Sequence, residues 1–308
     1  MTTIPQVSVV MSVYNGADAL RDSVESVLSQ QGVDVEFIIV NDGSTDASAS
    51  LLDSFAAADA RIRLLHQANQ GLTKALINGC ALARGGYIAR QDCGDKSLPG
   101  RLRAQMHTMQ SHPEAALVSC GARFVGPDLE PLYEVTLTEA EAATGLQTLE
   151  LPQLRGPAHH GSTLFRRDLY ERVGGYREQF YFAQDIDLWT RLVEHGRHVA
   201  MPDLLYQATF ALGSISGLHR KRQIETSKLI IESTRLRRAG QSDAPVLSRA
   251  RQIVPQAGGA SSNETASALY FVGTCLSKRR DPRARRYYRE ALRANPLHFR
   301  SAIRLLLG

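Results

Sequence analysis

The feature that most constrains this chain is the alternation of strand and helix patterns over its first 130 residues. Four short apolar runs typical of buried strands lie at residues 7–13, 35–40, 62–65 and 87–90. Helix patterns with short connections separate them, and a fifth strand pattern follows at residues 118–125. This alternation predicts an α/β fold with a mostly parallel sheet and helices on both of its faces.

Polar residues at the ends of three predicted strands give the first indication of function. In sheets of this kind, ligands bind beyond the carboxyl ends of the strands. The segments at residues 14–16, 41–43 and 92–95 occupy such positions, and two of them carry carboxylates. The sequence therefore predicts a polar, acidic ligand site at this edge of the sheet.

Composition and missing motifs exclude several classes of protein. With 43% hydrophobic residues and a net charge of +5, the chain is not expected to be disordered. The sequence has no apolar run of about 18 residues and no signal-peptide pattern, so we expect a cytoplasmic protein. Its four cysteines lie too far apart to match a zinc-binding motif, and we expect them to be reduced thiols. The fingerprints of dinucleotide-binding dehydrogenases, P-loop NTPases and α/β-hydrolases are missing.

The charge is unevenly distributed along the chain. From Arg220 onward there are 19 Lys and Arg against 6 Asp and Glu, whereas the preceding residues hold 17 against 25. We therefore expect a boundary between residues 1–219 and a basic helical region at 220–308. Such a region suggests an anionic partner, and the alternative is that the Arg-rich helices are simply soluble.

Four segments resemble the signatures of family-2 glycosyltransferases with the GT-A fold, which is Rossmann-like. They read VSVVMSVYNG, IIVNDGSTD, NQGLTKALINGCALARGGYIARQD and QDIDLW, in the family's order, over about residues 5–220. The resemblance implies a bacterial, inverting enzyme of hexosyltransferase type. Such an enzyme moves a sugar from a nucleoside-diphosphate-sugar to a hydroxyl acceptor, as in surface polysaccharide or glycan biosynthesis.

The resemblance also assigns residues to the donor. Ser12 and Tyr14 match positions that contact the nucleoside, and the Tyr14 ring can stack on a base. Asp42 matches the aspartate that accepts a hydrogen bond from the base edge. Lys74 can neutralise a phosphate, and Asp92 is expected near the ribose and the metal. The alternatives are an ordinary aromatic at residue 14, a turn at residue 42 and a solvated lysine at residue 74.

The acidic loop departs from the family pattern. Where relatives typically read Asp-Ala-Asp-Asp, this chain reads Asp92-Cys93-Gly94-Asp95, so Gly94 replaces the usual metal-binding aspartate. We expect a divalent metal, Mg²⁺ or Mn²⁺, at Asp92 and Asp95, because a glycine allows the loop to bring Asp95 inward. The alternative is a site that binds metal weakly or is inactive.

Asp185 matches the family's catalytic base, which takes the proton of the acceptor hydroxyl. The residue before it is usually acidic, and here it is Gln184. Loss of that like charge and the start of a helix both favour a lowered pKa for Asp185. The alternative is an ordinary helix-start acid.

Four further residues are candidates for the acceptor side or a closing loop. His159 and His160 precede a strand that resembles the acceptor-side strand, and one of them is expected to pack in the core. Trp189 can stack on a sugar, although a core position is the alternative. His219 follows a loop at residues 214–216 that resembles the mobile loop of relatives, and its imidazole can bind the metal or the diphosphate.

The tail and the overall function leave alternatives open. Residues 266–307 weakly resemble one tetratricopeptide unit, which cannot stand alone. Its basic residues can place the enzyme peripherally on the inner membrane face, beside a glycan or lipid-linked acceptor. Nucleic acid is not expected, because no reading motif is present. The main alternative function is a sugar-nucleotide-binding or scaffold protein whose catalytic site has decayed. A nucleotidyltransferase is a weaker alternative.

Overall fold

The computed structural model describes residues 4–210, 220–255 and 261–306. Two compact units divide the chain. Unit 1 comprises Met1–Ala122, Val135–Ala208 and Thr226–Ile253, and unit 2 comprises Arg123–Glu134, Thr209–Glu225 and Val254–Gly308. The α/β fold class with C-terminal helices is confirmed.

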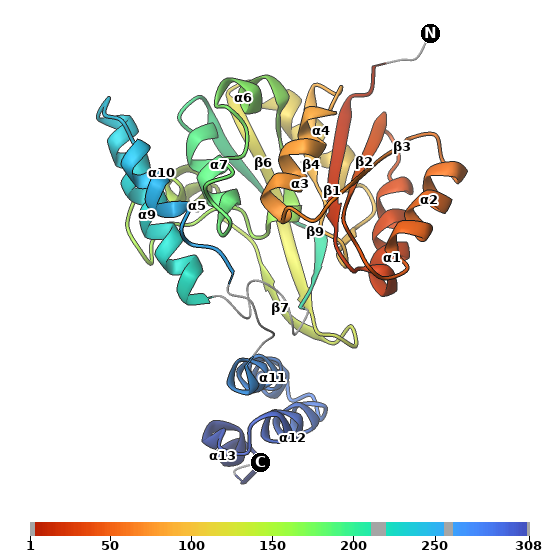
Figure 1. The fold of residues 1–308 in the computed structure, drawn as a ribbon, viewed down its shortest axis with the longest axis vertical. Coiled ribbons are helices and arrows are strands. Elements are labelled where there is room, and N and C mark those ends of the chain that lie inside the picture. The colour runs from red at the N-terminus through yellow and green to blue at the C-terminus, as the bar shows by residue number, and fades with distance from the viewer. Residues whose placement is uncertain (1–3, 211–219, 256–260, 307–308) are drawn as a thin grey trace. The chain divides into compact units, whose positions relative to one another are not determined.

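Four parallel strands form one half of the sheet in unit 1 (Figure 1). They are β1 (Val7–Val13), β2 (Val35–Asp42), β3 (Ile62–Gln67) and β4 (Tyr87–Arg90), and their order is β3-β2-β1-β4. All four lie where the apolar runs predict strands. Their buried, β-branched residues suit a sheet that is covered on both faces.

The other half of the sheet is antiparallel. The order continues through β8 (Thr163–Arg166), β6 (Ala115–Val125), β9 (Arg197–Thr209) and β5 (Lys96–Ser97). The β4–β8, β8–β6 and β9–β5 pairs are all antiparallel, so the sheet is mixed. The fifth predicted strand lies within β6, next to β8 rather than at the end of a parallel series.

Helices cover both faces of this sheet. Adjacent residues of β1 belong to different cores: Val9 packs with Leu20, Leu52 and Leu102, whereas Val10 packs with Leu76. Successive strand residues point to opposite faces, so two faces are buried. The helices concerned are α1 (Ala17–Leu28), α2 (Ser48–Ala58), α3 (Leu72–Ala81), α4 (Arg101–Ser111), α5 (Glu139–Gly145), α6 (Arg167–Arg172) and α7 (Gln184–Leu192), with a 3₁₀ turn, η1 (His160–Ser162), before β8.

Two helices beyond the boundary expected at residue 219 belong largely to unit 1. They are α9 (Arg220–Arg238) and α10 (Ala244–Ala250). Ile230 and Ala250 pack with Phe180 in one buried cluster. The compact units therefore divide the chain at other positions than residue 219, because an apolar face of these basic helices completes the first unit.

Unit 2 joins a hairpin to three helices. The hairpin is the end of β6 with β7 (Pro131–Val135), and the helices are α11 (Ser262–Lys278), α12 (Ala284–Ala294) and α13 (Phe299–Leu306). Leu132 of the hairpin packs with Leu269 and Tyr288. A Cβ at Gly273 would lie 2.8 Å from the Tyr288 ring, so this glycine allows α11 and α12 to approach closely. None of the described helices combines the length and hydropathy needed to cross a bilayer.

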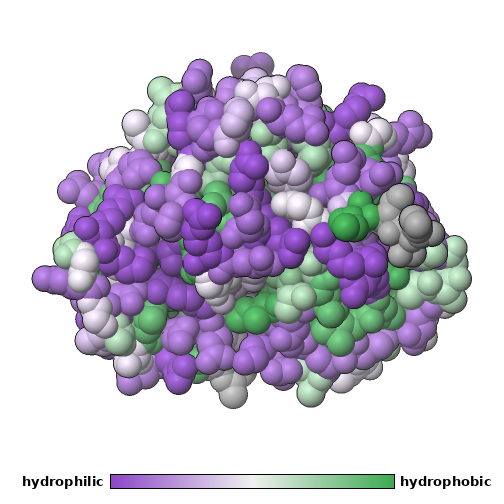
Figure 2. All heavy atoms as spheres, turned by 90° about the horizontal axis from the view of Figure 1, so that it is seen from above, coloured by the Kyte–Doolittle hydropathy of each residue, from purple (hydrophilic) through white to green (hydrophobic). Residues whose placement is uncertain are grey.

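Figure 2 shows the end of the molecule at the top of Figure 1, where β1 begins. Hydrophilic residues cover most of this face, and the apolar ones gather toward one side. Because β1 to β4 are parallel, this face lies at their amino ends. The carboxyl ends, where the sequence predicts the site, point the other way.

Candidate active site

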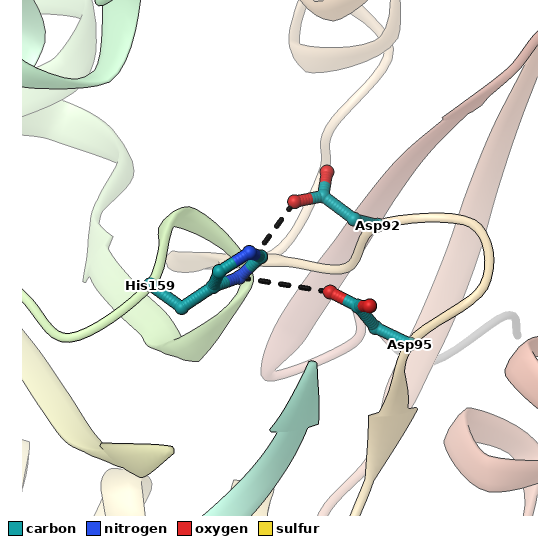
Figure 3. A group of neighbouring side chains, drawn as sticks. All are labelled: Asp92, Asp95 and His159. Carbon is teal, nitrogen blue, oxygen red and sulfur yellow. Dashed lines mark ion pairs between the residues drawn. The ribbon is translucent and has the colours of Figure 1, made fainter. Parts of the chain in front are cut away.

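Three side chains from two distant segments meet just beyond the carboxyl end of β4 (Figure 3). Asp92 and Asp95 lie on the loop after β4, and His159 caps η1. Each offers one ligand atom, and these atoms lie within 4.8 Å of one another. His159 Nδ1 is 3.8 Å from Asp92 Oδ2 and 3.6 Å from Asp95 Oδ2. The arrangement is a compact set of two carboxylates and one imidazole.

The buried guanidinium of Arg90 holds one of the two carboxylates in place. Arg90, the last residue of β4, is fully buried and donates to the Val10 carbonyl at 2.5 Å and to its neighbour Gln91 O at 2.8 Å. Its Nη2 also donates to Asp92 Oδ1. Burial tends to raise the pKa of Asp92, but the charge of Arg90 outweighs it and lowers that pKa to about 2. Asp92 is therefore ionised, and one of its oxygens is fixed.

Tyr206 of β9 holds the second carboxylate. Its hydroxyl donates to Asp95 Oδ2 at 2.9 Å and accepts from the Asp92 backbone N–H at 3.1 Å. The His159 ring stacks on the Tyr206 ring, with centroids 5.3 Å apart. Gly94 lies between the two acids with φ +96, a conformation that L side chains rarely adopt. The glycine thus permits the tight turn that returns Asp95 to the site.

The two adjacent histidines have different environments. His159 is partly exposed and borders the acids, whereas His160 is buried. Arg90 Nε donates to His160 Nε2 at 3.3 Å, and the Tyr176 hydroxyl lies 2.7 Å from the same nitrogen. Burial and then the Arg90 charge lower the pKa of His160 well below its usual value. His160 is therefore a neutral packing residue, and only His159 faces the acidic cluster.

Asp185 lies at the start of α7 within the electrostatic field of the same cluster. Burial raises its pKa, the Ile186 N–H and His159 lower it, and the charge of Asp92 raises it. The net direction is upward, so the expectation of a lowered pKa is wrong. Desolvation outweighs both the missing acid at Gln184 and the helix start.

Asp187, two residues on, faces elsewhere and has a structural environment. It is fully buried and accepts hydrogen bonds from Arg177 and Arg191. Burial tends to raise its pKa, but Arg191 and Arg177 outweigh it and lower the pKa. Two carboxylates on one short helix therefore have opposite electrostatic environments.

Asp42, at the end of β2, is nearly fully buried and already binds three donors of the chain. Its Oδ1 accepts from Gln67 Nε2 at 2.7 Å and from the Gln70 N–H at 2.9 Å, and its Oδ2 accepts from the Gly71 N–H at 2.8 Å. The carboxylate thus fastens the loop before α3. The sequence pattern did not predict that Asp42 would hold this loop.

Helix α3 is tied in turn to the segment before α7. Thr73 Oγ1 donates to the Phe180 carbonyl at 2.9 Å, and Lys74 forms an ion pair with Glu178 at 2.8 Å. A Cβ at Gly71 would lie 2.9 Å from the Tyr181 ring. These contacts connect the segment that Asp42 anchors with the segment that leads to Asp185.

The remaining predicted residues are more dispersed. Ser12 is partly buried near the end of β1, and Tyr14 just after it is 54% exposed. Trp189 is 3% exposed and packs in the core against His160, so the core alternative for this residue holds. The Lys74 ammonium is paired with Glu178 rather than solvated alone. His219 and the loop at 214–216 lie outside the described residues.

Sequence reasoning missed Arg90 and Tyr206. The only signal for Arg90 is a charged residue at the end of a buried strand, YIAR. Nothing in the sequence around Tyr206 distinguishes it from other strand tyrosines. Pairing between β9 and β5, which brings Tyr206 opposite Ser97, is what places it beside the acidic loop.

Comparisons with known proteins agree with this architecture. A model described as "Glycosyl transferase family 2" matches residues 8–174. Putative glycosyltransferase EpsE of Bacillus subtilis is 32% identical over 212 residues, covering 67% of this chain and 74% of that protein. Putative glycosyltransferase EpsH of the same bacterium is 35% identical over 240 residues, covering 74% of this chain and 68% of that protein. The chain spans only 54% of a third relative, the uncharacterized glycosyltransferase EpsJ.

Solved structures share the fold. One is the mannosyltransferase PcManGT from Pyrobaculum calidifontis in complex with GDP-Man and Mn²⁺, with a TM-score of 0.57, 18% identity and coverage of 90% of this chain and 75% of that one. Another is S. aureus TarS 1-349, with a TM-score of 0.58, 15% identity and coverage of 89% and 82%. At these identities, the likeness is one of fold, and the fold of these neighbours is GT-A.

Proposed function

Because a family model matches more than half of its length, the chain belongs to glycosyltransferase family 2, and from that premise we propose that it is an inverting enzyme of hexosyltransferase type. It transfers a sugar from a nucleoside-diphosphate-sugar to an acceptor hydroxyl in surface polysaccharide or glycan biosynthesis. The observation that carries the proposal is the meeting of Asp92, Asp95 and His159 just beyond the carboxyl end of β4, where His159 and Asp92 also affect the pKa of Asp185 electrostatically.

The donor is proposed to lie along the ends of β1, β2 and β4. The structural neighbours named above bind GDP-Man and, for TarS, UDP or UDP-GlcNAc. The exposed Tyr14 ring is available to stack on the base, and Ser12, partly buried near the end of β1, is proposed to contact the nucleoside as well. Asp42 contributes by holding the 67–71 loop and offers its remaining acceptor capacity to a base N–H. The Lys74 ammonium would leave its ion pair with Glu178 and bind a phosphate of the donor instead.

The acidic loop fits a divalent cation. Asp92 and Asp95 are hard oxygen donors, and the ionised Asp92 leaves one oxygen facing the cluster while Arg90 holds the other. Bound there, Mg²⁺ or Mn²⁺ would stabilise the negative charge of the leaving diphosphate. The chain's own contribution is to fix both carboxylates through Arg90 and Tyr206, so that little reorganisation is needed on binding.

Asp185 is proposed to be the base. The reaction forms a bond between the acceptor oxygen and the anomeric carbon, breaks the bond from that carbon to the diphosphate, and transfers the hydroxyl proton to a carboxylate oxygen. Burial raises the pKa of Asp185 toward the working pH, which makes it a better proton acceptor when ionised. His159 is partly exposed and lowers the pKa of Asp185 electrostatically, and the acceptor is proposed to enter on its side of the site.

A paired measurement tests this assignment. Asp185→Asn should abolish transfer while leaving the affinity for the donor nearly intact, measured by calorimetry and a transfer assay. Asp187→Asn is unsuitable as a functional control because its side chain is structural, so Asp168→Asn, an acid near the start of α6, serves instead. Unchanged turnover of Asp185→Asn would remove it from the role. Donor binding without turnover of any sugar nucleotide by the native chain would favour the decayed sugar-nucleotide-binding protein.

Unit 2 is proposed to hold the enzyme peripherally on an anionic membrane surface, next to a glycan or lipid-linked acceptor. Residues 254–308 hold ten Lys and Arg against three Asp and Glu. Arg285, Arg289 and Arg293 recur every four residues on α12 and are exposed. On α13 and just before it, four apolar side chains are exposed by 46–86%: Leu297, Phe299, Ile303 and Leu306. Exposed basic and apolar side chains on the same unit suit an interface with anionic lipid.

Sedimentation with liposomes tests the membrane proposal. The native chain should co-sediment with vesicles that contain anionic lipid and not with purely zwitterionic ones. Replacing Arg285, Arg289 and Arg293 by Gln should weaken that association about a hundredfold, because each of the three basic residues contributes about 1 kcal/mol. Replacing Arg21, Arg103 and Arg172 of unit 1 by Gln is the matched control. Equal binding by both triple variants would contradict the proposal.

A further inference from the structure

We propose that His159 is a third protein ligand of the divalent cation, so that the site prefers ions that accept imidazole nitrogen, such as Mn²⁺ or Co²⁺, over Mg²⁺. The inference rests on the proposed function, because it assumes that a cation binds at Asp92 and Asp95. It adds a ligand and a metal preference that neither the acidic loop nor the family match assigns.

The distances place His159 as a ligand rather than as a hydrogen-bond partner of the acids. Its Nδ1 lies 3.6 Å from Asp95 Oδ2 and 3.8 Å from Asp92 Oδ2, which is too long for hydrogen bonds (Figure 3). Two donor atoms that share one ion, each at roughly 2.1–2.3 Å, lie about 3–3.5 Å apart. The two distances from His159 Nδ1 are therefore within a few tenths of an ångström of those expected for a shared ion, and all three donor atoms lie within 4.8 Å of one another.

The Nδ1 atom is already in the form that binds metal. The Gly161 N–H donates to it at 3.1 Å, so Nδ1 carries a lone pair and the ring proton lies on Nε2. A cation would take over that lone pair, and the Gly161 N–H would lose this partner. The exchange is local, because His159 is partly exposed and Gly161 belongs to the short η1 turn.

The surroundings of the three side chains resemble the outer shell of a metal site. Tyr206 donates to Asp95 and stacks on the His159 ring, while Arg90 fixes Asp92. Such outer contacts orient the ligands and typically change metal affinity by about 10–100-fold when removed. One residue, Tyr206, thus orients two of the three proposed ligands.

The donor set decides which ion is favoured. Mg²⁺ prefers oxygen ligands alone and keeps several waters, whereas imidazole suits transition ions. Two carboxylates and one imidazole therefore favour Mn²⁺ or Co²⁺. The third position of the loop, Gly94, has no side chain to offer, so the nitrogen comes from a distant segment.

Electron spin-echo spectroscopy of bound Mn²⁺ tests the proposal directly, using the full chain with UDP or GDP as a probe. The native chain should show nitrogen coupling to Mn²⁺, and labelling its histidines with ¹⁵N should change that coupling. His159→Ala and His159→Gln should lose it, with Mn²⁺ affinity lowered about 10–100-fold and Mg²⁺ affinity changed less than about threefold. His112→Ala, a histidine paired with Glu114 on the surface, is the matched control and should behave as the native chain.

The outcomes separate this proposal from the one on which it rests. Mn²⁺ binding without histidine coupling would overturn the ligand role of His159 and leave a carboxylate-bound cation in place. Equal losses of Mn²⁺ and Mg²⁺ affinity in both His159 variants would also overturn it, because the residue would then only shape the loop. Binding of the nucleoside diphosphate with no divalent cation would overturn the metal part of both proposals.

Discussion

Removing the charge of Asp187 should destabilise the fold, whereas removing that of Asp185, on the same helix, should not. Asp187 is fully buried, and it accepts from Arg177 Nε at 3.1 Å and from Arg191 Nη2 at 2.6 Å. Asp187→Asn leaves these two guanidinium groups facing a neutral amide. Removing one partner of a buried ion pair typically costs about 3–5 kcal/mol. For a unit of this size, that corresponds to a fall in Tm of roughly 6–20 °C.

Asp185→Asn is the matched variant. Within the described residues, Asp185 has no ion pair with Lys or Arg, and its hydrogen bond from the Ile186 N–H at 2.9 Å can be kept by an Asn oxygen. Burial raises the pKa of Asp185, so its ionised form costs stability in the folded state. We therefore expect the free energy of unfolding of Asp185→Asn to be unchanged or higher than that of the native chain.

The two carboxylates should make the free energy of unfolding change with pH in opposite directions. The pKa of Asp187 is lowered, so its contribution is fully present above the unfolded value near 4 and is lost as pH falls through the lower folded value. Asp185 has the opposite effect because its pKa is raised in the folded state. Its contribution to stability is lost as the pH rises from its pKa in the unfolded chain through its pKa in the folded chain. Thermal unfolding monitored by circular dichroism from about pH 2 to pH 8 covers both ranges. Equal destabilisation by the two variants would refute the reasoning.

Three further predictions concern the site and the core. Gly161→Ala should displace Tyr206, because the added Cβ would overlap the Tyr206 hydroxyl, and we expect cation affinity measured by calorimetry to fall about tenfold or more. Arg90→Met should let burial raise the pKa of Asp92 from about 2, so that cation binding declines in mildly acidic buffer where the native chain still binds; identical pH profiles would contradict this. Trp189→Phe should leave transfer within about twofold and cost about 1–2 kcal/mol in stability, because Trp189 is a core residue whose Nε1 has no partner in the described residues; a large loss of activity at unchanged Tm would indicate a sugar contact instead.

The sequence predicts the first half of the fold better than the second, for a physical reason. The strands at residues 7–13 and 87–90 are mostly apolar, because they are buried on both faces. The strand expected after His159 and His160 begins only at Thr163, behind η1, because His159 and Ser162 satisfy local backbone groups and favour a 3₁₀ turn. Long-range antiparallel pairing, as in β5 with β9, leaves no local signal.

The same distinction applies to the candidate site. Asp92, Asp95 and Asp185 could be nominated because each follows or begins a recognisable element. The direction of the Asp185 pKa could not, because it depends on burial by segments distant in sequence. The contribution of Arg90 and Tyr206 is likewise a property of packing, since their partners lie up to 114 positions away.

The ties between α3 and residues 178–181 also bear on how specificity could be engineered. Thr73 and Lys74 join the loop that Asp42 anchors to the approach of α7. Exchanging only one of these two segments for that of a homologue would break the contacts that hold the other. Chimeras intended to alter the sugar or the acceptor should therefore carry both segments together, and effects of single exchanges should not be summed.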